Sequence, residues 1–398
     1  MKDVIIVANF AQGPGEISND RFAYIANLIK DDCNVELITS SFHHKNKKQR
    51  EKHSETVNKN FTITTVYEPG YPKNICLQRF YSHWVWGRNL KKYLKSRKKP
   101  DVIYCAVPSL TGPLEAAKYC QKNGVKFIVD VQDLWPEAFK MVFNIPIVSD
   151  IIFAPFNWLA NGIYKRADEV VAVSDTYVNR ALSVNKKCNS GHTVFLGTRL
   201  ETFDVCANGE AMLKKPDGKV WIGYCGSLAA SYDIPNLIYA VKRLNNKGIN
   251  DIKLIVMGDG AYRQEFEDLA VVEGVDAVFT GTLPYNDMCA QLKECDIVVN
   301  PIKSGSAASI INKHGDYAAS GLPVVNSQDS PEYRKLVEEY NMGLNCNNED
   351  PEDMADKLEQ LILNKDMRLE MGKNARRCAE EKFDRKNSYK EILDTIIK

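Results

Sequence analysis

The chain has 398 residues, of which 44% are hydrophobic and 26% charged, so it has the composition of a globular protein. This length is too great for one hydrophobic core and favours two domains. No apolar run reaches the roughly 18 residues of a spanning helix, and the start lacks the apolar core of a signal peptide. The 11 cysteines are scattered, without C-x-x-C pairs or zinc-like spacing, so we expect a cytoplasmic protein with free thiols and no metal site.

Charge is distributed unevenly along the chain. Residues 1–200 carry 28 Lys and Arg against 18 Asp and Glu, or +10, whereas residues 201–398 carry 24 against 33, or −9. The basic residues of the first half concentrate in Lys45–Lys52 and Lys91–Lys99. Two explanations of these basic segments remain open. They are solvated surface segments, or they contact the anionic inner face of a membrane, to which the protein would bind peripherally. No nucleic-acid-binding motif accompanies the charge, so nucleic acid is not an expected partner.

The first half alternates short β-branched runs with helical patterns, which predicts a parallel sheet covered by helices. Helical spacing is clear between Asn19 and Lys30, and His53–Asn74 is expected to be a loop with one extra strand. The predicted strands are Val4–Asn9, Val35–Ser40, Val102–Ala106, Lys126–Asp130 and Glu169–Val173.

The second half repeats this pattern. Glycine, asparagine and proline residues between positions 197 and 218 indicate a linker, and residues 387–397 a short amphipathic helix. We therefore expect domains at residues 1–197 and 198–380, followed by a C-terminal helical segment, 381–398, that packs back on the first domain. The predicted strands are Val220–Tyr224, Ile252–Met257, Ala277–Thr280, Ile297–Asn300 and Pro323–Val325.

The most informative stretch runs from Asp296 to Ser327. A strand ends near Asn300, a Gly/Ser loop follows, and a helix is expected to start after Ser309, its predicted N-cap, and to end at Gly321. Along one side of this helix runs a polar stripe at spacings of i, i+3, i+4 and i+7: Ser309, Asn312, Lys313 and Asp316.

This stripe fits a nucleotide diphosphate. The helix N-terminus is a ready anion site, Lys313 adds a positive charge for a phosphate, and Asp316 can accept hydrogen bonds from sugar hydroxyls. From spacing alone, a solvated helix face beside an ordinary cap is an equally good explanation.

The segment Asn312–Val325, NKHGDYAASGLPVV, resembles the donor-site helix of the family 4 (group 1) retaining glycosyltransferases, which have the GT-B fold. The family pattern is similar to N-K-x-x-E-Y-x-A-x-G-x-P-V-V, which puts Asp316 where a ribose-binding glutamate is expected. An earlier glutamate that often contacts the donor sugar is replaced here by Ala308. The resemblance therefore leaves the donor sugar open, as well as whether Ala308 reduces activity.

Further segments resemble the donor-binding turns of the same family. The loop Ala229–Leu237 lacks the basic residues that often hold the diphosphate, so Lys313 is expected to carry more of that role. The expected donor-binding residues are Gly15, Gly226, Ser227, Gly258, Gly260, Thr282, Leu283, Ser309, Ile310, Ile311, Asn312, Lys313 and Asp316.

In the first half, the segment Asp130–Glu137 follows a predicted strand and is similar to the D-L-W-P-E motif of a subgroup that works in bacterial surface polysaccharide assembly. Asp133 is the candidate catalytic and acceptor residue of this half. Glu137 and Asn19 are further acceptor candidates, and Arg21 is expected to reach the same cleft. Alternatively, the segment only anchors a helix start, with Glu137 as a first-turn partner of the helix dipole.

Two groups of side chains receive no chemical role from the sequence. Without metal-binding neighbours, the histidines are expected on the surface or in the core. The aromatic stretch Phe80–Trp86 is expected to be core rather than an acceptor platform.

The sequence thus predicts an α/β protein with two Rossmann-like, doubly wound domains of the GT-B type facing across a cleft. The expected activity is metal-independent, retaining transfer from a nucleotide-diphosphate sugar to a polysaccharide or lipid-linked acceptor, with Asp133 and Lys313 as catalytic residues and no further cofactor. A nucleotide-sugar epimerase on the same fold, a catalytically silent partner subunit and a two-lobed ligand-binding protein remain as alternatives.

Overall fold

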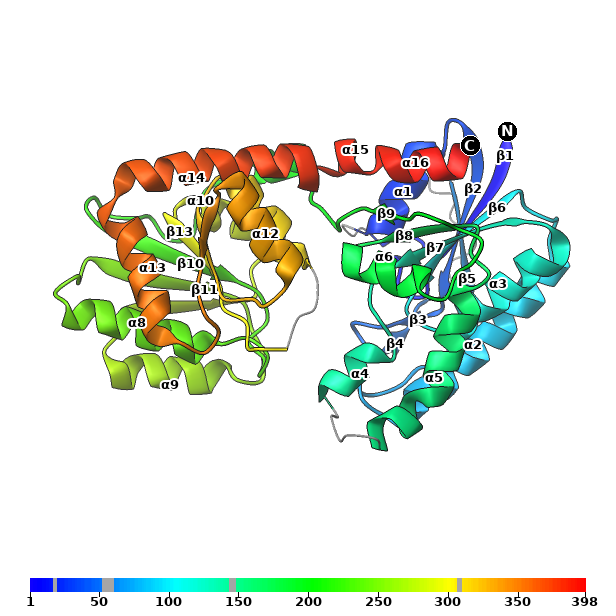
Figure 1. Ribbon diagram of the computed structural model, residues 1–398, viewed down its shortest axis with the longest axis horizontal. Helices are drawn as coiled ribbons and strands as arrows, with labels where there is room; N and C mark the ends of the chain where they lie inside the picture. Colours follow the sequence, from blue (N-terminus) through cyan, green and yellow to red (C-terminus); the bar gives the residue numbers. More distant parts are fainter. Residues whose placement is uncertain (17–19, 52–60, 143–147, 306–309) are drawn as a thin grey trace. The chain divides into compact units, whose positions relative to one another are not determined.

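The computed structural model describes residues 1–16, 20–51, 61–142, 148–305 and 310–398. The chain folds as two compact units: unit 1, Met1–Val194 with Tyr389–Lys398, and unit 2, Phe195–Ser388. Each unit contains its own parallel sheet with helices packed against it (Figure 1). The chain crosses into unit 2 after Val194, close to the boundary expected after residue 197, and its last ten residues belong to unit 1.

Among its described residues, unit 1 forms a parallel sheet of seven strands in the order β5-β2-β1-β6-β7-β8-β9, with a short antiparallel ribbon after β2. The strands are β1 (Lys2–Val7), β2 (Cys33–Ser40), β5 (Thr62–Val66), β6 (Val102–Val107), β7 (Lys126–Val131), β8 (Glu169–Ala172) and β9 (His192–Thr193), and the ribbon is β3 (Phe42–His43) with β4 (Lys48–Gln49). The helices are α1 (Arg21–Ile29), α2 (Leu77–Ser96), α3 (Thr111–Asn123), α4 (Glu137–Val142), α5 (Val148–Tyr164), α6 (Asp175–Leu182) and α16 (Lys390–Ile397).

Within the described part of unit 2, six parallel strands are ordered β12-β11-β10-β13-β14-β15. The strands are β10 (Val220–Cys225), β11 (Ile252–Met257), β12 (Ala277–Gly281), β13 (Ile297–Asn300), β14 (Val324–Asn326) and β15 (Gly343–Asn345). The helices are α7 (Leu200–Ala207), α8 (Ile234–Asn246), α9 (Arg263–Glu273), α10 (Tyr285–Lys293), α11 (Asn312–Ser320), α12 (Pro331–Tyr340), α13 (Pro351–Leu363), α14 (Lys365–Cys378) and α15 (Arg385–Ser388), with a π-helical turn η1 (Ala379–Phe383).

The sheet of unit 2 is buried on both faces because its strands are apolar at successive positions. Along β10, Ile222 and Tyr224 pack into one core with α8, α9 and α13, whereas Trp221 packs into a second core on the other face with α10, α11 and α14. Parallel sheets covered on both faces require such continuous apolar runs.

All ten predicted strands are present, with ends that differ by no more than two residues. The extra strand expected within His53–Asn74 is β5. Two short edge strands, β9 and β15, were not predicted. The linker prediction for residues 197–218 is wrong in part, because α7 lies there and packs against α10.

Across the described residues, no helix is both long enough and apolar enough to cross a bilayer.

Candidate functional site

The strand order of unit 2 reverses between β10 and β13, which are neighbours in the sheet. In open α/β sheets, ligands bind outside the carboxyl ends of the strands at such a switch point. The Gly226 turn follows β10, and Asn300 ends β13. Helix α11, which carries the predicted polar stripe, comes next along the chain and leads into β14.

Helix α11 begins at Asn312 with Ile311 as its N-cap, so the prediction that Ser309 caps the helix is wrong. Instead, His314 Nδ1 accepts a hydrogen bond from the Ile311 N–H at 3.2 Å, which covers one of the amide groups at the helix start. Gly321 ends the helix with φ 69°, as predicted. Ser309 itself, together with Ala308, lies outside the described residues.

Lys313 is a buried cation, and no anionic side chain of the described residues pairs with it. Its side chain is only 7% exposed, and its Nζ lies 4.3 Å and 4.2 Å from the ring centroids of Tyr224 and Tyr232. Among the described residues, Nζ has no hydrogen-bond partner. Burial lowers the pKa of Lys313 to about 7. A Cβ built on Gly226 would lie 3.1 Å from this nitrogen, so the glycine turn and the cation adjoin each other.

Asp316, one helical turn further on, is held by two hydroxyl groups. Its Oδ1 accepts hydrogen bonds from Thr198 Oγ1 at 2.8 Å and from Tyr285 Oη at 2.9 Å. Burial raises the pKa of Asp316. Asn312, by contrast, is exposed. The polar stripe therefore divides into the buried Lys313, the half-buried Asp316 and the solvent-facing amide of Asn312.

Sequence reasoning missed a buried polar cluster next to Lys313. His314 is fully buried and stacks on Tyr333 with ring centroids 3.5 Å apart. Its Nε2 lies 3.1 Å from Asn300 Nδ2, which also donates to Asn326 Oδ1 and Gln328 Oε1. Burial lowers the pKa of His314, so the ring is neutral. The signal was available, because an asparagine ends each of the neighbouring strands β13 and β14.

The glycines after β11 are required by packing. β10 and β11 pair in register up to Cys225 and Met257, so the turns that follow these strands meet. A Cβ on Gly258 would lie 1.8 Å from the Gly226 carbonyl oxygen, and one on Gly260 would lie 2.2 Å from the Leu228 oxygen. This contact accounts for both glycines without a ligand, and their role in donor binding stays a prediction.

The remaining donor candidates of unit 2 lie near the same strand ends. Ser227 is exposed, and its carbonyl accepts a hydrogen bond from the Tyr224 hydroxyl at 2.8 Å. Thr282 and Leu283 follow β12; the threonine is exposed and the leucine packs against the core. Ile310 is buried in that same core, and Ile311 is half-buried.

In unit 1, the carboxylates after β7 have separate partners. Asp133 Oδ2 accepts a hydrogen bond from Trp135 Nε1 at 3.1 Å, and burial raises the pKa of Asp133. Glu137 begins α4 and forms an ion pair with Arg180 of α6. The geometry of Glu137 thus favours the structural alternative, while the roles of both residues toward an acceptor stay predictions.

The expectation that Arg21 reaches a cleft is wrong. Arg21 is 4% exposed and forms an ion pair with Asp130, with Nε and Oδ2 2.9 Å apart. This pair ties α1 to the end of β7.

Asn19 lies outside the described residues. Gly15 has φ 77°, a conformation that glycine adopts readily in tight turns, and a Cβ built on it would lie in open space. Its role in donor binding stays a prediction.

The sequence also missed Arg79, at the start of α2. Its guanidinium lies 4.6 Å from the ring of Trp135, 5.5 Å from that of Tyr71 and 5.9 Å from that of Phe10. These rings come from segments that follow β7, β5 and β1, at the carboxyl end of the sheet. Arg79 thus lies at the edge where a ligand of unit 1 is expected.

Two histidines complete this cluster. His83 is buried in the core, and His44 is half-buried and hydrogen-bonded to the Tyr71 hydroxyl. Burial, with the charges of Lys47 and Arg79, lowers the pKa of His44 to about 4, and burial with Arg79 lowers that of His83 to about 3. Both rings are therefore neutral at pH 7, and the positive charge of the cluster rests on Arg79 and Lys47.

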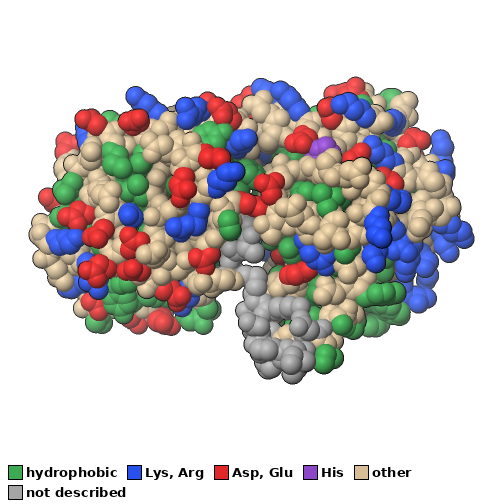
Figure 2. Space-filling view, viewed as in Figure 1, with side chains coloured by type: hydrophobic (Ala, Val, Ile, Leu, Met, Phe, Trp, Pro, Cys, Tyr) green, Lys and Arg blue, Asp and Glu red, His purple; other side chains and the backbone are tan. Residues whose placement is uncertain are grey.

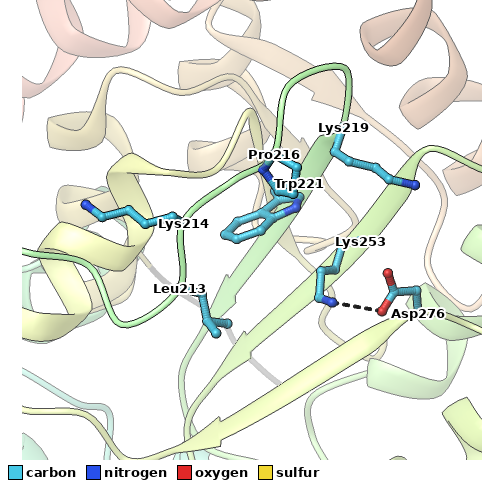
Figure 3. A pocket seen from close by; sticks show the side chains of 7 residues that line it. All are labelled: Leu213, Lys214, Pro216, Lys219, Trp221, Lys253 and Asp276. Atoms are coloured by element: carbon cyan, nitrogen blue, oxygen red, sulfur yellow. Dashed lines mark ion pairs between the residues drawn. The ribbon is translucent and has the colours of Figure 1, made fainter.

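A cavity of about 200 Å³ in unit 2 lies at the opposite edge of the sheet (Figure 3). Its walls include Lys219, Trp221, Lys253 and Asp276, with the last two joined by an ion pair of 3.0 Å. Lys219 precedes β10, Lys253 is near the start of β11 and Asp276 precedes β12, so this cavity is at the amino ends of the strands. It is not part of the Lys313 site.

The family comparison covers the unit that holds Lys313. Residues 210–378 match the family model described as glycosyl transferases group 1. Unit 2 is therefore similar to the group 1 glycosyltransferases over most of its length. The matched range includes the Gly226 and Gly258 turns, Lys313 and Asp316.

Two curated proteins are similar to parts of the chain. An uncharacterized glycosyltransferase of Methanocaldococcus jannaschii is 26% identical over 242 residues, which cover 59% of this chain and 60% of that protein. The sulfoquinovosyl transferase of Arabidopsis thaliana is 31% identical over 136 residues, or 34% of this chain and 26% of that protein. The chain thus matches less than two thirds of the length of either relative.

Similar solved structures cover both units of the chain and show its fold. Sucrose-phosphate synthase from Thermosynechococcus elongatus superposes with a TM-score of 0.73 at 14% identity, covering 100% of this chain and 98% of that one. Anabaena HepE in complex with UDP gives 0.69 at 14% identity, covering 100% and 99%. A trehalose-6-phosphate structure from E. coli bound with UDP-2-fluoro glucose gives 0.71 at 12% identity, covering 99% of each chain. The predicted α/β, two-Rossmann GT-B fold is confirmed.

Proposed function

We propose that this protein is a metal-independent, retaining glycosyltransferase that moves a sugar from a nucleotide-diphosphate donor to a polysaccharide or lipid-linked acceptor. The observation that carries the proposal is the ammonium group of Lys313, which has no partner in the described part of the chain and is buried beside the Gly226 turn at the carboxyl ends of β10 and β13. A buried charge without a partner is costly, and a bound anion removes that cost.

A diphosphate is the anion that fits best. The turn after β10 offers backbone amides with no side chain in the way at Gly226, and the start of α11 adds the positive end of a helix dipole. In this proposal, Lys313 stabilises the negative charge that develops on the leaving diphosphate as the glycosidic bond to the donor sugar breaks. Electrostatic stabilisation of this kind is often the largest single contribution to catalysis. Because Lys313 can provide it, the proposal requires no metal ion.

Asp316 is proposed to bind or position the ribose of the donor. Its carboxylate already holds the hydroxyls of Tyr285 and Thr198, so its orientation is fixed before a ligand arrives. Several of the similar solved structures hold UDP or a UDP-sugar, which makes UDP-sugars the first donors to test.

Unit 1 is proposed to bind the acceptor. Asp133 is the candidate base toward an acceptor hydroxyl, because burial raises its pKa toward the range in which a carboxylate accepts protons readily. Arg79 is partly exposed and lies beside the buried rings of Trp135 and Tyr71, so its guanidinium offers a positive charge for an acidic acceptor.

The experiment is a panel of UDP-, GDP- and dTDP-sugars, measured by calorimetry with the full chain and then with acceptor fractions. We expect one nucleotide class to bind and its diphosphate to be released only when acceptor is present. Isomerised sugar without acceptor would instead indicate an epimerase. Absence of binding to every nucleotide would contradict the proposal and favour a silent subunit.

Replacing Asp316 tests the site itself. Asp316→Ala removes the carboxylate that accepts two hydrogen bonds within the protein and, in the proposal, a third from a ribose hydroxyl. Donor affinity is therefore expected to fall about tenfold. Tyr285→Phe is the matched control, since it loosens the same carboxylate without removing it. Equal donor affinity in wild type and Asp316→Ala would count against the assignment.

A further inference from the structure

Helix α2 of unit 1 has an outward face that changes character along its length. Leu77, Tyr81 and Trp84 are exposed on its first half, Leu77 by 85%. The second half continues the same stripe with exposed basic side chains: Arg88, Lys91, Lys92 and Lys95. Spacings of three and four residues place both sets on one side of the helix. The helix contains no Asp or Glu.

The start of α5 extends the apolar end of this face. Ile151 is 69% exposed and Trp158 is 72% exposed, and the sequence from Ile151 to Tyr164 contains no charged residue. Rings inside unit 1 join the two helices, because Phe80 of α2 and Phe156 of α5 have centroids 4.9 Å apart. The exposed apolar side chains of α2 and α5 therefore come from two helices that pack against each other.

The basic end of the face continues onto α3. A cavity of about 460 Å³ is lined by Lys91, Lys95, Lys118 and Lys122 together with Glu115 and Tyr119. Glu115 forms ion pairs with Lys91 at 2.6 Å and with Lys118 at 3.4 Å, so one carboxylate faces four lysines. Lys and Arg side chains gather over the edge of unit 1 that carries α2 and α3 (Figure 2).

From this arrangement we infer that the α2–α5 face is a docking surface for an anionic lipid membrane. Exposed tryptophan, tyrosine and isoleucine side chains enter the interface between headgroups and acyl chains, as those of interfacial helices do. The lysines beside them meet the headgroup phosphates, each contributing attraction that salt weakens. This inference goes beyond the proposed transfer reaction and does not depend on it.

The distribution of charged and apolar side chains on this face favours a lipid membrane as its partner over a protein or a nucleic acid. A nucleic-acid site needs basic residues along its whole length, whereas half of this face is apolar. A stable protein interface tends to exclude lysine from its contact area. Aromatic anchors beside a run of lysines are typical of the boundary between water and bilayer.

The test is co-sedimentation of the full chain with vesicles of phosphatidylcholine alone or with an equal part of phosphatidylglycerol. We expect binding to the anionic vesicles, weakened by salt, and little binding to the neutral ones. Lys92→Glu with Lys95→Glu should weaken anionic binding by at least about tenfold. The matched control places the same charge change on unit 2, at the exposed Lys365 and Lys373.

The apolar half has its own variant. Ile151→Ser with Ile152→Ser should also weaken binding about tenfold, whereas Val271→Ser with Val272→Ser should not, although these valines of α9 are more exposed than the two isoleucines. Equal circular dichroism melting curves would show that each variant is folded. Binding that is the same for both vesicle types, or is lost no more in the test pairs than in the controls, would overturn the inference. So would a concentration-dependent dimer that Ile151→Ser with Ile152→Ser abolishes, since a second copy would then cover this face.

Discussion

At the scale of single residues, the least expected finding is the burial of Lys313. Its position in a polar helical stripe was predicted from spacing, but its two tyrosine neighbours were not, because Tyr224 and Tyr232 lie far from it in sequence. The same limit applies to Arg21, whose partner Asp130 is 109 positions away. Spacing along one helix predicts which side chains share a face, but not what that face meets.

Donor binding is expected to depend on pH through Lys313. UDP-glucose suits this test, because its diphosphate keeps the same charge between pH 6 and 9. In the free protein Lys313 loses its proton above its pKa of about 7, while a bound diphosphate holds the proton in place. Binding therefore takes up a proton, and affinity should fall by up to about tenfold per pH unit above pH 7. Calorimetry in buffers of different ionisation enthalpy counts that proton.

The variant Lys313→Met keeps the side-chain volume and removes the charge. Its affinity should be lower at pH 7 and should no longer change with pH. Stability should also depend on pH. Lys313 is protonated below pH 10.5 in the unfolded chain but only below about pH 7 in the folded chain. Relative to Lys313→Met, the wild type should lose stability as pH falls from 10.5 to 7 and change no further below that. A wild type that matches the variant in both measurements would contradict the assignment.

At the scale of elements, strands were predictable and their packing details were not. Continuous runs of valine and isoleucine between glycine turns indicated the ten main strands directly, because such runs are buried on both faces. The edge strands β9 and β15 are two and three residues long, too short for any periodicity. The sequence predicts a linker where α7 lies, because glycine and proline flank this segment, although its own residues are compatible with a helix.

The glycine turns after β10 and β11 pack so closely that a single added methyl group should separate them. Gly258→Ala would place a carbon 1.8 Å from the Gly226 carbonyl oxygen, so the two turns must separate. We expect a loss of about 3 kcal/mol or more in the free energy of unfolding, together with loss of donor binding. Gly218→Ala is the control: it has φ 80° but open space around it, and should cost only about 1 kcal/mol. Denaturant titration measures both, and equal losses would show that backbone conformation, not contact, determines the effect.

At the scale of the whole molecule, the chain leaves unit 1 after Val194 and ends in it again. The sequence predicted a C-terminal helix from its amphipathic pattern, and α16 has that pattern with Tyr389, Ile392 and Ile396 fully buried. These side chains pack in the core of unit 1 with the first strand and α1. The stability of unit 1 therefore depends on residues that follow the whole of unit 2 along the chain.

This dependence predicts that changes in α16 act on unit 1 alone. Ile392→Ala and Ile396→Ala each leave a cavity in a buried cluster and should destabilise unit 1 by about 2 to 5 kcal/mol. Four of the five tryptophans lie in unit 1, and Trp221 alone lies in unit 2, so fluorescence in a Trp221→Phe background follows unit 1. Ile238→Ala, which removes an equally buried isoleucine from the core of unit 2, is the control and should leave this signal in place. If the α16 variants and Ile238→Ala shift the fluorescence transition equally, the two units unfold together, and the last ten residues stabilise the molecule as a whole.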